Sequence, residues 1–307
     1  MNTIGRRWNA LTPGYRVVLT VVAGLVALAV VISASLAMYA IARTNADYAE
    51  VFGDDSNPDR IDITAAINRA DTSAQILVVT LSNIQALGAL ADEGGNYVSD
   101  MRILTTSTTN DAIELKKSQW PADVEQRFAL YGTVTDYPFD RYSALMELRV
   151  VTPDGDIVPT SVTVYNNDAF VHVDAIEDPT LGPIEGTGID VALQVKRSTP
   201  MVVFAVFIMV LMLGLALAAV TAAYFVLRWR KGLVFGACSM MAGILFALIP
   251  LRNAVPGSPP IGSVIDFAAF FIAEIIISIS LISSVVFGYR IHMAKARVVH
   301  DGRAQQP

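Results

Sequence analysis

Four blocks of this 307-residue chain are apolar almost throughout. Residues 17–41, 201–227 and 232–251 carry no charged side chain, and residues 265–289 carry only two, Asp266 and Glu274. About 20 apolar residues are enough for a helix to cross the hydrocarbon core of a bilayer. We therefore predict four transmembrane helices at these positions. The first block is longer than the roughly 7–15-residue apolar core of a signal peptide, which indicates an uncleaved signal anchor.

Residues 42–200, between the first two blocks, follow a different pattern. Short runs alternate apolar and polar side chains, as in "AQILVVTLS", "ALMELRVVT" and "IDVALQVKR", and turn-forming residues separate them. Seven to nine such runs are typical of a sandwich of β-sheets. We predict an antiparallel β-sandwich domain in residues 42–200. Its first part, residues 42–60, is polar, and the stretch "FGDDSNPDR" indicates a solvated linker.

The charges indicate the topology. The segment 42–200 holds 25 acidic and 11 basic side chains, whereas the rest of the chain holds 3 and 11. Apart from Arg252, the basic residues outside this segment cluster within residues 6–16, 228–231 and 290–303, which four spans would bring to one side of the membrane. The positive-inside rule makes that side the cytoplasm. We therefore expect a multi-pass inner (plasma) membrane protein with cytoplasmic residues 1–16 and 290–307, and with the 42–200 domain outside.

Composition also narrows the function. Hydrophobic residues make up 53% of the chain and charged residues 16%, and an acidic outer domain does not fit a nucleic-acid partner. The only cysteine, Cys238, lies in the third predicted span, so no disulfide is expected in the outer domain. No phosphate-binding loop, nucleophile elbow or zinc motif is present. We expect no cofactor, no metal and no catalytic residue.

The two acidic residues of the fourth span receive different interpretations. Asp266 follows Ser263 by three residues and precedes an apolar run, as in a capping box, and about 35 Å of helix separates it from the inner boundary at Tyr289. We expect Asp266 to cap the helix at the membrane interface, with an asparagine able to replace it.

Glu274 lies roughly 22 Å from Tyr289 by the same rise and therefore inside the hydrocarbon layer. A charge there usually faces protein or water. Three roles stay open: structural pairing within the bundle, with Arg252 as the expected partner; contact with the helices of another subunit; and a proton or substrate path.

The segment "PFDRY", Pro138 to Tyr142, is a second candidate. Asp140 and Arg141 are adjacent polar residues between aromatic side chains. We interpret the segment as a corner packed by its aromatic residues, with Asp140 bonding nearby backbone, and keep a partner-contact site as the alternative.

Three stretches resemble a known family. "SQWPADVEQRFALYGTVTDYPFDRY", "LRVVTPDG" and "LRNAVPGSPPIGSVIDFAAFFIAE" are similar to actinobacterial envelope membrane proteins of unknown function, and the resemblance covers nearly the whole chain past residue 60. That family has one N-terminal span, an outer β domain and three C-terminal spans. The resemblance implies an accessory subunit of a mammalian-cell-entry type lipid importer, and it transfers no catalytic residues.

We therefore expect a non-enzymatic accessory or interaction subunit of a cell-envelope membrane assembly. Its partners would be other membrane subunits, including a lipid transporter permease, and the bilayer. A stand-alone sensor or ligand-binding receptor is one alternative, and a membrane-embedded transporter or enzyme that uses Glu274 is another.

Overall fold

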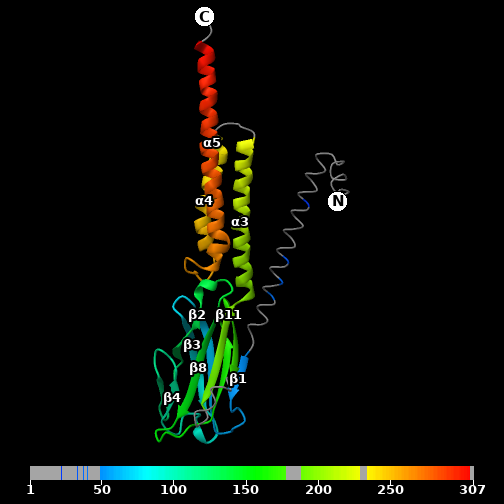
Figure 1. Cartoon of the computed structure of the whole chain (residues 1–307). Coiled ribbons are helices and arrows are strands. Elements are labelled where there is room, and N and C mark those ends of the chain that lie inside the picture. The colour runs from blue at the N-terminus through cyan, green and yellow to red at the C-terminus, as the bar shows by residue number, and fades with distance from the viewer. Residues whose placement is uncertain are drawn as a thin grey trace. The chain divides into compact units, whose positions relative to one another are not determined.

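The computed structural model describes residues 49–177, 188–228 and 234–304, with side chains as far as residue 294, and four isolated N-terminal positions: Val22, Ser33, Ala37 and Ala40. The chain divides into two units, Met1–Asp47 and Tyr48–Pro307. The predicted first span, 17–41, lies outside the described residues except at those four positions. The second unit contains a β-rich domain followed by apolar helices (Figure 1).

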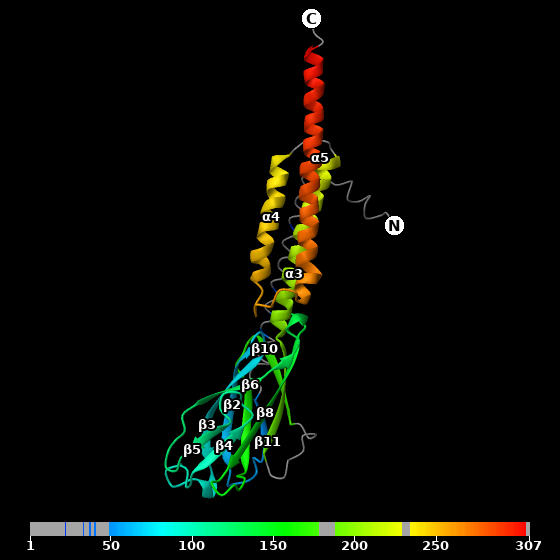
Figure 2. The ribbon, with the colours of Figure 1, turned by 60° about the vertical axis from the view of Figure 1, so that its left-hand side comes forward.

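A β-sandwich-like domain of two sheets forms the first part of this unit (Figure 2). One sheet has the strand order β1-β9-β2-β3-β6, and the other has the order β10-β11-β8-β4-β5, with the short β7 paired to β8. The strands of the first sheet are β1 (Ala49–Gly53), β9 (Thr160–Asn166), β2 (Ile61–Asp71), β3 (Ile76–Ala86) and β6 (Val124–Ala129). Those of the second are β10 (Val171–Glu177), β11 (Ile189–Arg197), β8 (Arg141–Val151), β4 (Met101–Thr105), β5 (Ala112–Leu115) and β7 (Tyr131–Gly132).

The alternating sequence pattern produces the core of the sandwich. In β11, Ile189, Val191, Leu193 and Val195 are at most 3% exposed, while the residues between them point away from the core. Successive side chains of a strand point to opposite faces of its sheet, so this period of two buries one face of each sheet. The predicted sandwich is therefore confirmed.

One strand lies where a linker was predicted. β1 occupies residues 49–53 and pairs with β9, and Phe52 is buried in the core. Gly53 then ends the strand with φ +87°, and a Cβ at this position would lie 2.4 Å from the carbonyl oxygen of Thr160. Residues 49–53 of the expected linker therefore belong to the sandwich, because β1 gains hydrogen bonds along β9 and buries an aromatic side chain.

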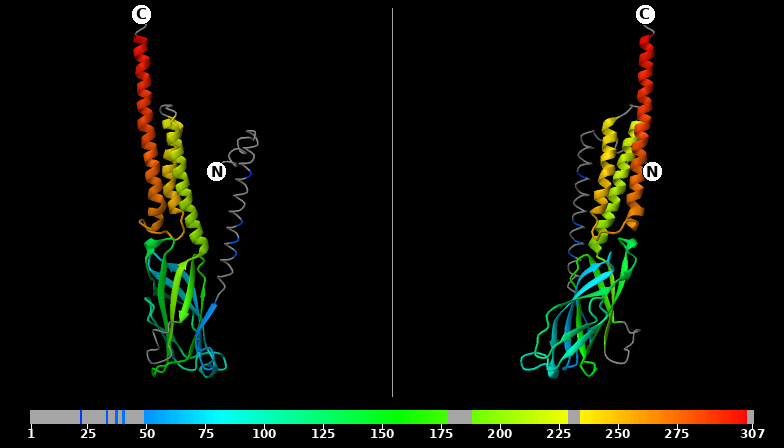
Figure 3. Two further views of the ribbon diagram at one scale, coloured as in Figure 1. Left: turned by 45° about the vertical axis from the view of Figure 1, so that its right-hand side comes forward. Right: turned by 90° about the vertical axis from the view of Figure 1, so that its left-hand side faces the viewer.

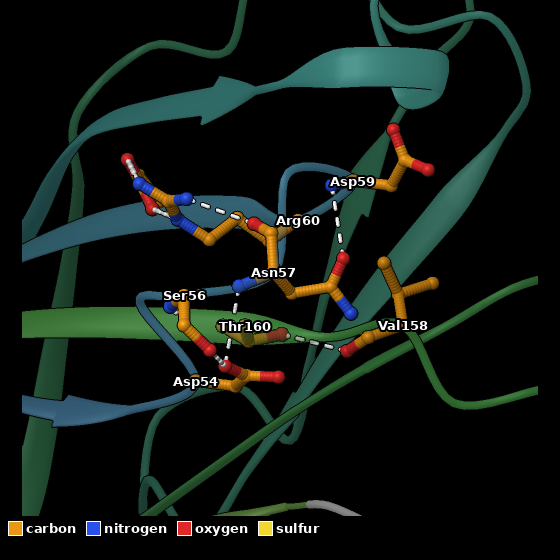
Figure 4. Close-up of polar contacts among 8 residues, drawn as sticks. Asp54, Ser56, Asn57, Asp59, Arg60, Val158 and Thr160 are labelled. Atoms are coloured by element: carbon orange, nitrogen blue, oxygen red, sulfur yellow. Dashed lines mark hydrogen bonds and ion pairs between the residues drawn. The ribbon is translucent and has the colours of Figure 1, made fainter.

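The remainder of "FGDDSNPDR" is an ordered turn (Figure 4). Asp54 Oδ1 accepts hydrogen bonds from the backbone N–H of Ser56 and Asn57, both at 3.2 Å, and Ser56 Oγ donates to the same oxygen at 2.7 Å. Asn57 Oδ1 accepts from the N–H of Asp59 at 3.0 Å. Aspartate and asparagine side chains thus satisfy the backbone of a turn that runs back into β2.

The sandwich also departs from a purely antiparallel arrangement. β2 and β9 run parallel, with Ile61 opposite Thr160 and Ile67 opposite Asn166. Both strands begin at the end of the sandwich where the 54–60 turn and the loop after β8 lie, so they enter the sheet in the same direction. The predicted all-antiparallel topology is wrong for this pair.

Three apolar helices follow the sandwich: α3 (Thr199–Arg228), α4 (Phe235–Asn253) and α5 (Phe271–Ala304), the last preceded by the π-helical turn η4 (Asp266–Phe270). Three segments, Thr199–Arg228, Phe235–Asn253 and Asp266–Ala294, are long and apolar enough to cross a membrane. α5 continues through the segment expected as a cytoplasmic tail, 290–307, as far as Ala304. Its 34 residues correspond to about 51 Å of helix, which exceeds the hydrocarbon thickness.

Small side chains lie where the helices touch. α3, α4 and α5 run side by side (Figure 3), and the buried residues of α3 include Ala205, Ala216, Ala219 and Ala223 at helical spacing. Ala273 on α5 is fully buried in the same cluster. Because lipid tails are as apolar as leucine, helices associate in a membrane through close packing, which small residues permit.

Gln126 breaks the pattern of the sandwich core. It lies on β6 opposite Val79 and, like Phe128 two residues later, is 0% exposed. Neither its amide nitrogen nor its amide oxygen has a hydrogen-bond partner among the described residues. A buried polar group without a partner costs about 1–3 kcal/mol of folding free energy.

We therefore expect Gln126→Leu to raise the stability of the sandwich by about 1 kcal/mol, because leucine has a similar volume and no polar group to satisfy. Thermal unfolding of the purified protein should show a higher melting temperature. Gln194→Leu, at an exposed position of β11, is the matched control and should give no gain. A lower melting temperature for Gln126→Leu would show that the amide has a partner in solution.

Candidate functional site

A buried ion pair lies at the end of the sandwich where β11 leads into α3. Arg197 is the last residue of β11, two residues before α3, and Asp140 directly precedes β8. Arg197 Nε lies 3.0 Å from both carboxylate oxygens of Asp140, and Nη2 lies 2.8 Å from Oδ2. The side chains are 4% and 0% exposed. A pair so completely removed from water is stable only if its other polar atoms are also satisfied.

Two further side chains satisfy this pair. The hydroxyl of Tyr142 donates to Asp140 Oδ2 at 2.8 Å, and Arg197 Nη2 donates to Thr72 Oγ1 at 2.8 Å. Burial alone would lower the pKa of Arg197, but the hydrogen bonds and charge of Asp140 raise it above its ordinary value. The guanidinium is therefore charged at every physiological pH.

Tyr137 belongs to a loop of the sandwich, but its side chain packs among the helices. Its ring belongs to the buried cluster of the helices, together with Met201, Val255 and Ile265, and is 0% exposed. The guanidinium carbon of Arg197 lies 5.1 Å from the ring centroid, within the range of a cation–π contact. Burial raises the pKa of Tyr137 to about 12, so its hydroxyl is neutral. That hydroxyl has no hydrogen-bond partner among the described residues.

The backbone of the loop between α4 and η4 packs directly against Arg197. Gly257, at φ +82°, has no side chain, and a Cβ there would lie 2.8 Å from Arg197 Nη1 and 2.9 Å from Met201 Cε. Both the backbone angle and the lack of space require glycine at this position.

A second buried ion pair lies at the same end of the bundle. Arg252 Nε and Nη2, near the end of α4, contact the two carboxylate oxygens of Asp266 at 2.8 and 2.9 Å. The N–H of Gly262 donates to Asp266 at 2.8 Å, and Arg252 also donates to the carbonyl oxygen of Pro260 at 3.0 Å. The side chains are 10% and 1% exposed. This bidentate pair holds the α4–η4 loop, which in turn covers Arg197. We call the two ion pairs and Tyr137 the junction.

The structure corrects the interpretation of both acidic residues in the last span. Asp266 is a buried ion-pair partner of Arg252 rather than a helix cap, and the hydroxyl of Ser263 lies 3.4 Å from its carboxylate instead of capping the backbone. Glu274 is half-buried on α5 and makes no hydrogen bond or ion pair with the described residues. Arg252 therefore pairs with Asp266, through Nε and Nη2, and not with Glu274 as expected.

The "PFDRY" segment also differs from the prediction. Asp140 binds a side chain from the other end of the domain sequence rather than nearby backbone. Its neighbour Arg141 is exposed at the start of β8, opposite Lys196, and takes no part in the junction. Phe139 is 58% exposed and does not pack into a corner, whereas Tyr137 and Tyr142 are buried as expected.

Arg197 was not singled out from the sequence, although it is central to the junction. The available signal was a basic residue at the end of an alternating strand, directly before an apolar span, where a charge needs a partner. Its partner Asp140 lies 57 residues earlier, and no spacing rule connects the two.

The two halves of this unit match two different families. Residues 51–195 match a domain of unknown function, DUF4436, and residues 197–291 match a second domain of unknown function, DUF8686. No curated protein matches the chain. Asp140 lies in the first matched region and Arg197 begins the second, so the buried ion pair joins the two. In the part of the chain that the structure describes, no three His, Cys, Asp or Glu side chains are placed to hold a metal ion.

We expect Asp140→Asn and Asp266→Asn each to destabilise the protein by about 3–5 kcal/mol, because each leaves a buried guanidinium without its counter-charge. The melting temperature of the purified protein should fall by on the order of 10 °C.

The control is Asp174→Asn, which removes a carboxylate from an exposed ion pair with Lys196. Its effect should stay within about 0.5 kcal/mol. If Asp266→Asn proves as mild as this control, Asp266 serves only as a helix cap.

Proposed function

We propose that this protein is a non-enzymatic accessory subunit of a cell-envelope membrane assembly. The observation that carries the proposal is Glu274, a half-buried carboxylate inside a membrane-spanning helix without a partner among the described residues. Acidic groups at such depth usually face protein or a water-filled cavity and pair with another group. A polar group on a neighbouring subunit is the partner that best fits this requirement.

The other membrane segments of the chain do not supply a countercharge. The uncharged stretch 17–41 contains no basic side chain, and neither do residues 201–227. Arg252, the basic residue at the end of α4, already forms a bidentate ion pair with Asp266. A cationic or hydrogen-bonding partner for Glu274 is therefore expected from a different polypeptide.

The junction supports the same function. Because Tyr137 packs in the buried cluster of the helices and Arg197 contacts Met201 of α3, the position of the sandwich is fixed relative to the helices to which a partner would bind. A sandwich held in a fixed position on the helices suits a subunit that positions the other components of an assembly. The resemblance of "RNAVPGSPPIGS" and "PFDRY" to actinobacterial envelope proteins favours a mammalian-cell-entry type lipid importer as the assembly, with its permease as the partner.

We expect the wild-type protein, tagged at native expression levels, to copurify with a transporter permease in fixed stoichiometry. Glu274→Leu should reduce this recovery clearly while the protein level stays normal, because the polar contact is lost. Glu274→Gln, which keeps volume and hydrogen bonding, should have a mild effect.

Thr221→Leu is the control for this experiment. It also replaces a polar side chain on an exposed helix face, but the Thr221 hydroxyl is bonded to the carbonyl of Leu217 in its own helix. Recovery should be unchanged. Isolation of the wild-type protein alone would favour a stand-alone receptor. Loss of function in Glu274→Gln with full partner recovery would favour a titrating carboxylate on a transport path.

The proposed location is the inner (plasma) membrane, with the sandwich outside and both termini in the cytoplasm. The charge asymmetry of the sequence supports this orientation. In a Cys238→Ser background, a cysteine at exposed Thr109 should react with an impermeant thiol reagent in intact cells. A cysteine at Ala304 should react only after the cells are opened, and the reverse pattern would contradict the orientation.

A further inference from the structure

Four large apolar side chains around the junction are exposed. Phe139 and Phe170 of the sandwich are 58% and 59% exposed, and Ile261 and Phe267 of the helix bundle are 83% and 65% exposed. We call these four residues the junction rim. An exposed apolar residue is ordinary when isolated, but a group of four at one level of a membrane protein indicates contact with something apolar.

The two phenylalanines of the sandwich flank the strand that becomes the first apolar helix. β11 lies between β10 and β8, and Phe170 precedes β10 while Phe139 precedes β8 by two residues. The carbonyl oxygen of Phe170 accepts a hydrogen bond from the N–H of Ser198 at 3.0 Å, one residue before α3 begins. Both rings therefore lie at the level where the apolar helix starts.

The two rim residues of the bundle lie at the level of the second ion pair. Phe267 follows Asp266 in η4, and Ile261 precedes Gly262, whose N–H binds the Asp266 carboxylate. The two ion pairs mark the end of the bundle that adjoins the sandwich. All four rim residues therefore gather where apolar helix surface gives way to the sandwich.

This level coincides with the headgroup region if the helices cross a bilayer. Aromatic side chains are enriched at membrane–water interfaces, and apolar side chains of peripheral segments insert into the headgroup boundary. The first turns of α3, which begin at this level, also expose apolar side chains, among them Phe204 and Phe207. We propose that the junction rim inserts into the headgroup layer on the sandwich side of the membrane, so that this end of the sandwich is a lipid-contact surface.

The opposite end of the sandwich provides an internal comparison. Trp120 is 56% exposed and lies beside Gly95. The two residues belong to the loops before the start of β4 and after the end of β5. Met101 pairs with Leu115 there, and Arg102 pairs with Val151 at the end of β8 that is remote from Asp140. The proposal requires no lipid near Trp120.

Tyr131 supplies an intermediate position. It is 68% exposed and pairs with Ser143, which is itself opposite Gln194 of β11. Gln194 precedes Arg197 by three residues, which corresponds to about 10 Å along a strand. Lipid contact should therefore weaken from Phe139 and Phe170 to Tyr131.

The experiment uses tryptophan fluorescence of the full chain in vesicles of zwitterionic lipid that contain spin-labelled lipid near the headgroup. Trp8, Trp120 and Trp229 are replaced by phenylalanine, and single reporters are introduced as Phe139→Trp, Phe170→Trp or Tyr131→Trp. The first two should show blue-shifted emission and strong quenching by the labelled lipid, and the third should show weaker quenching. A chain that keeps only Trp120 should show red-shifted, unquenched emission.

Two outcomes would overturn the proposal. If both phenylalanine reporters are as unquenched as Trp120, the rim does not contact lipid. The vesicles contain only this chain, so a rim whose true role is to bind a protein partner would also give this result and would overturn the proposal. If high salt abolishes the quenching, the contact is electrostatic and not apolar. The test depends on the helices spanning the bilayer and is independent of any partner of Glu274.

Discussion

The Arg197–Asp140 ion pair is the interaction on which the rest of this arrangement depends. It lies at 4% and 0% exposure between the end of β11 and the start of β8, and each partner has an additional hydrogen bond, to Thr72 and from Tyr142. A buried pair adds little to stability compared with apolar packing, but it costs a great deal to break. That asymmetry makes it effective at holding Arg197 in one position, where its guanidinium also contacts Tyr137 and Met201 and lies under Gly257 of the helix bundle.

The second ion pair extends the same constraint. Arg252 and Asp266 hold the loop in which Gly257 passes directly over Arg197, and Tyr137 fills the space between the sandwich and the helices. The two matched families meet at Arg197, so the contact is made by residues from both. Glu274 lies about 12 Å further along the helix from Asp266, eight residues on, and has no ion-pair partner among the described residues.

Local pattern was sufficient to predict most of the fold. Long apolar runs, two of them uncharged and the third with only Asp266 and Glu274, predicted the three described apolar helices, because the bilayer imposes a simple length requirement. Period-two alternation predicted most of the strands for a similarly direct reason. β1 was not predicted, because Phe52 is followed at once by the turn residues of "GDDSN". The strand is short, and it forms only through its pairing with β9.

The junction could not be predicted in the same way. Asp140 and Asp266 were recognised as candidates, but their partners Arg197 and Arg252 lie 57 and 14 residues away in the chain. Asp266 fits a capping pattern locally, and only the position of Arg252 across the loop shows that a buried ion pair is formed instead. Long-range electrostatic pairing is a property of the folded chain and leaves no periodic signal in the sequence.

The most direct test of this account is a distance measurement between the sandwich and the helices in a lipid bilayer. Spin labels at Asp154 and Asn253, both exposed, in a Cys238→Ser background would report that distance by pulsed electron paramagnetic resonance. The account predicts one narrow distance distribution for the protein with an intact junction and a broad distribution when Asp140→Asn is added. A distribution that is already broad with the junction intact would contradict it.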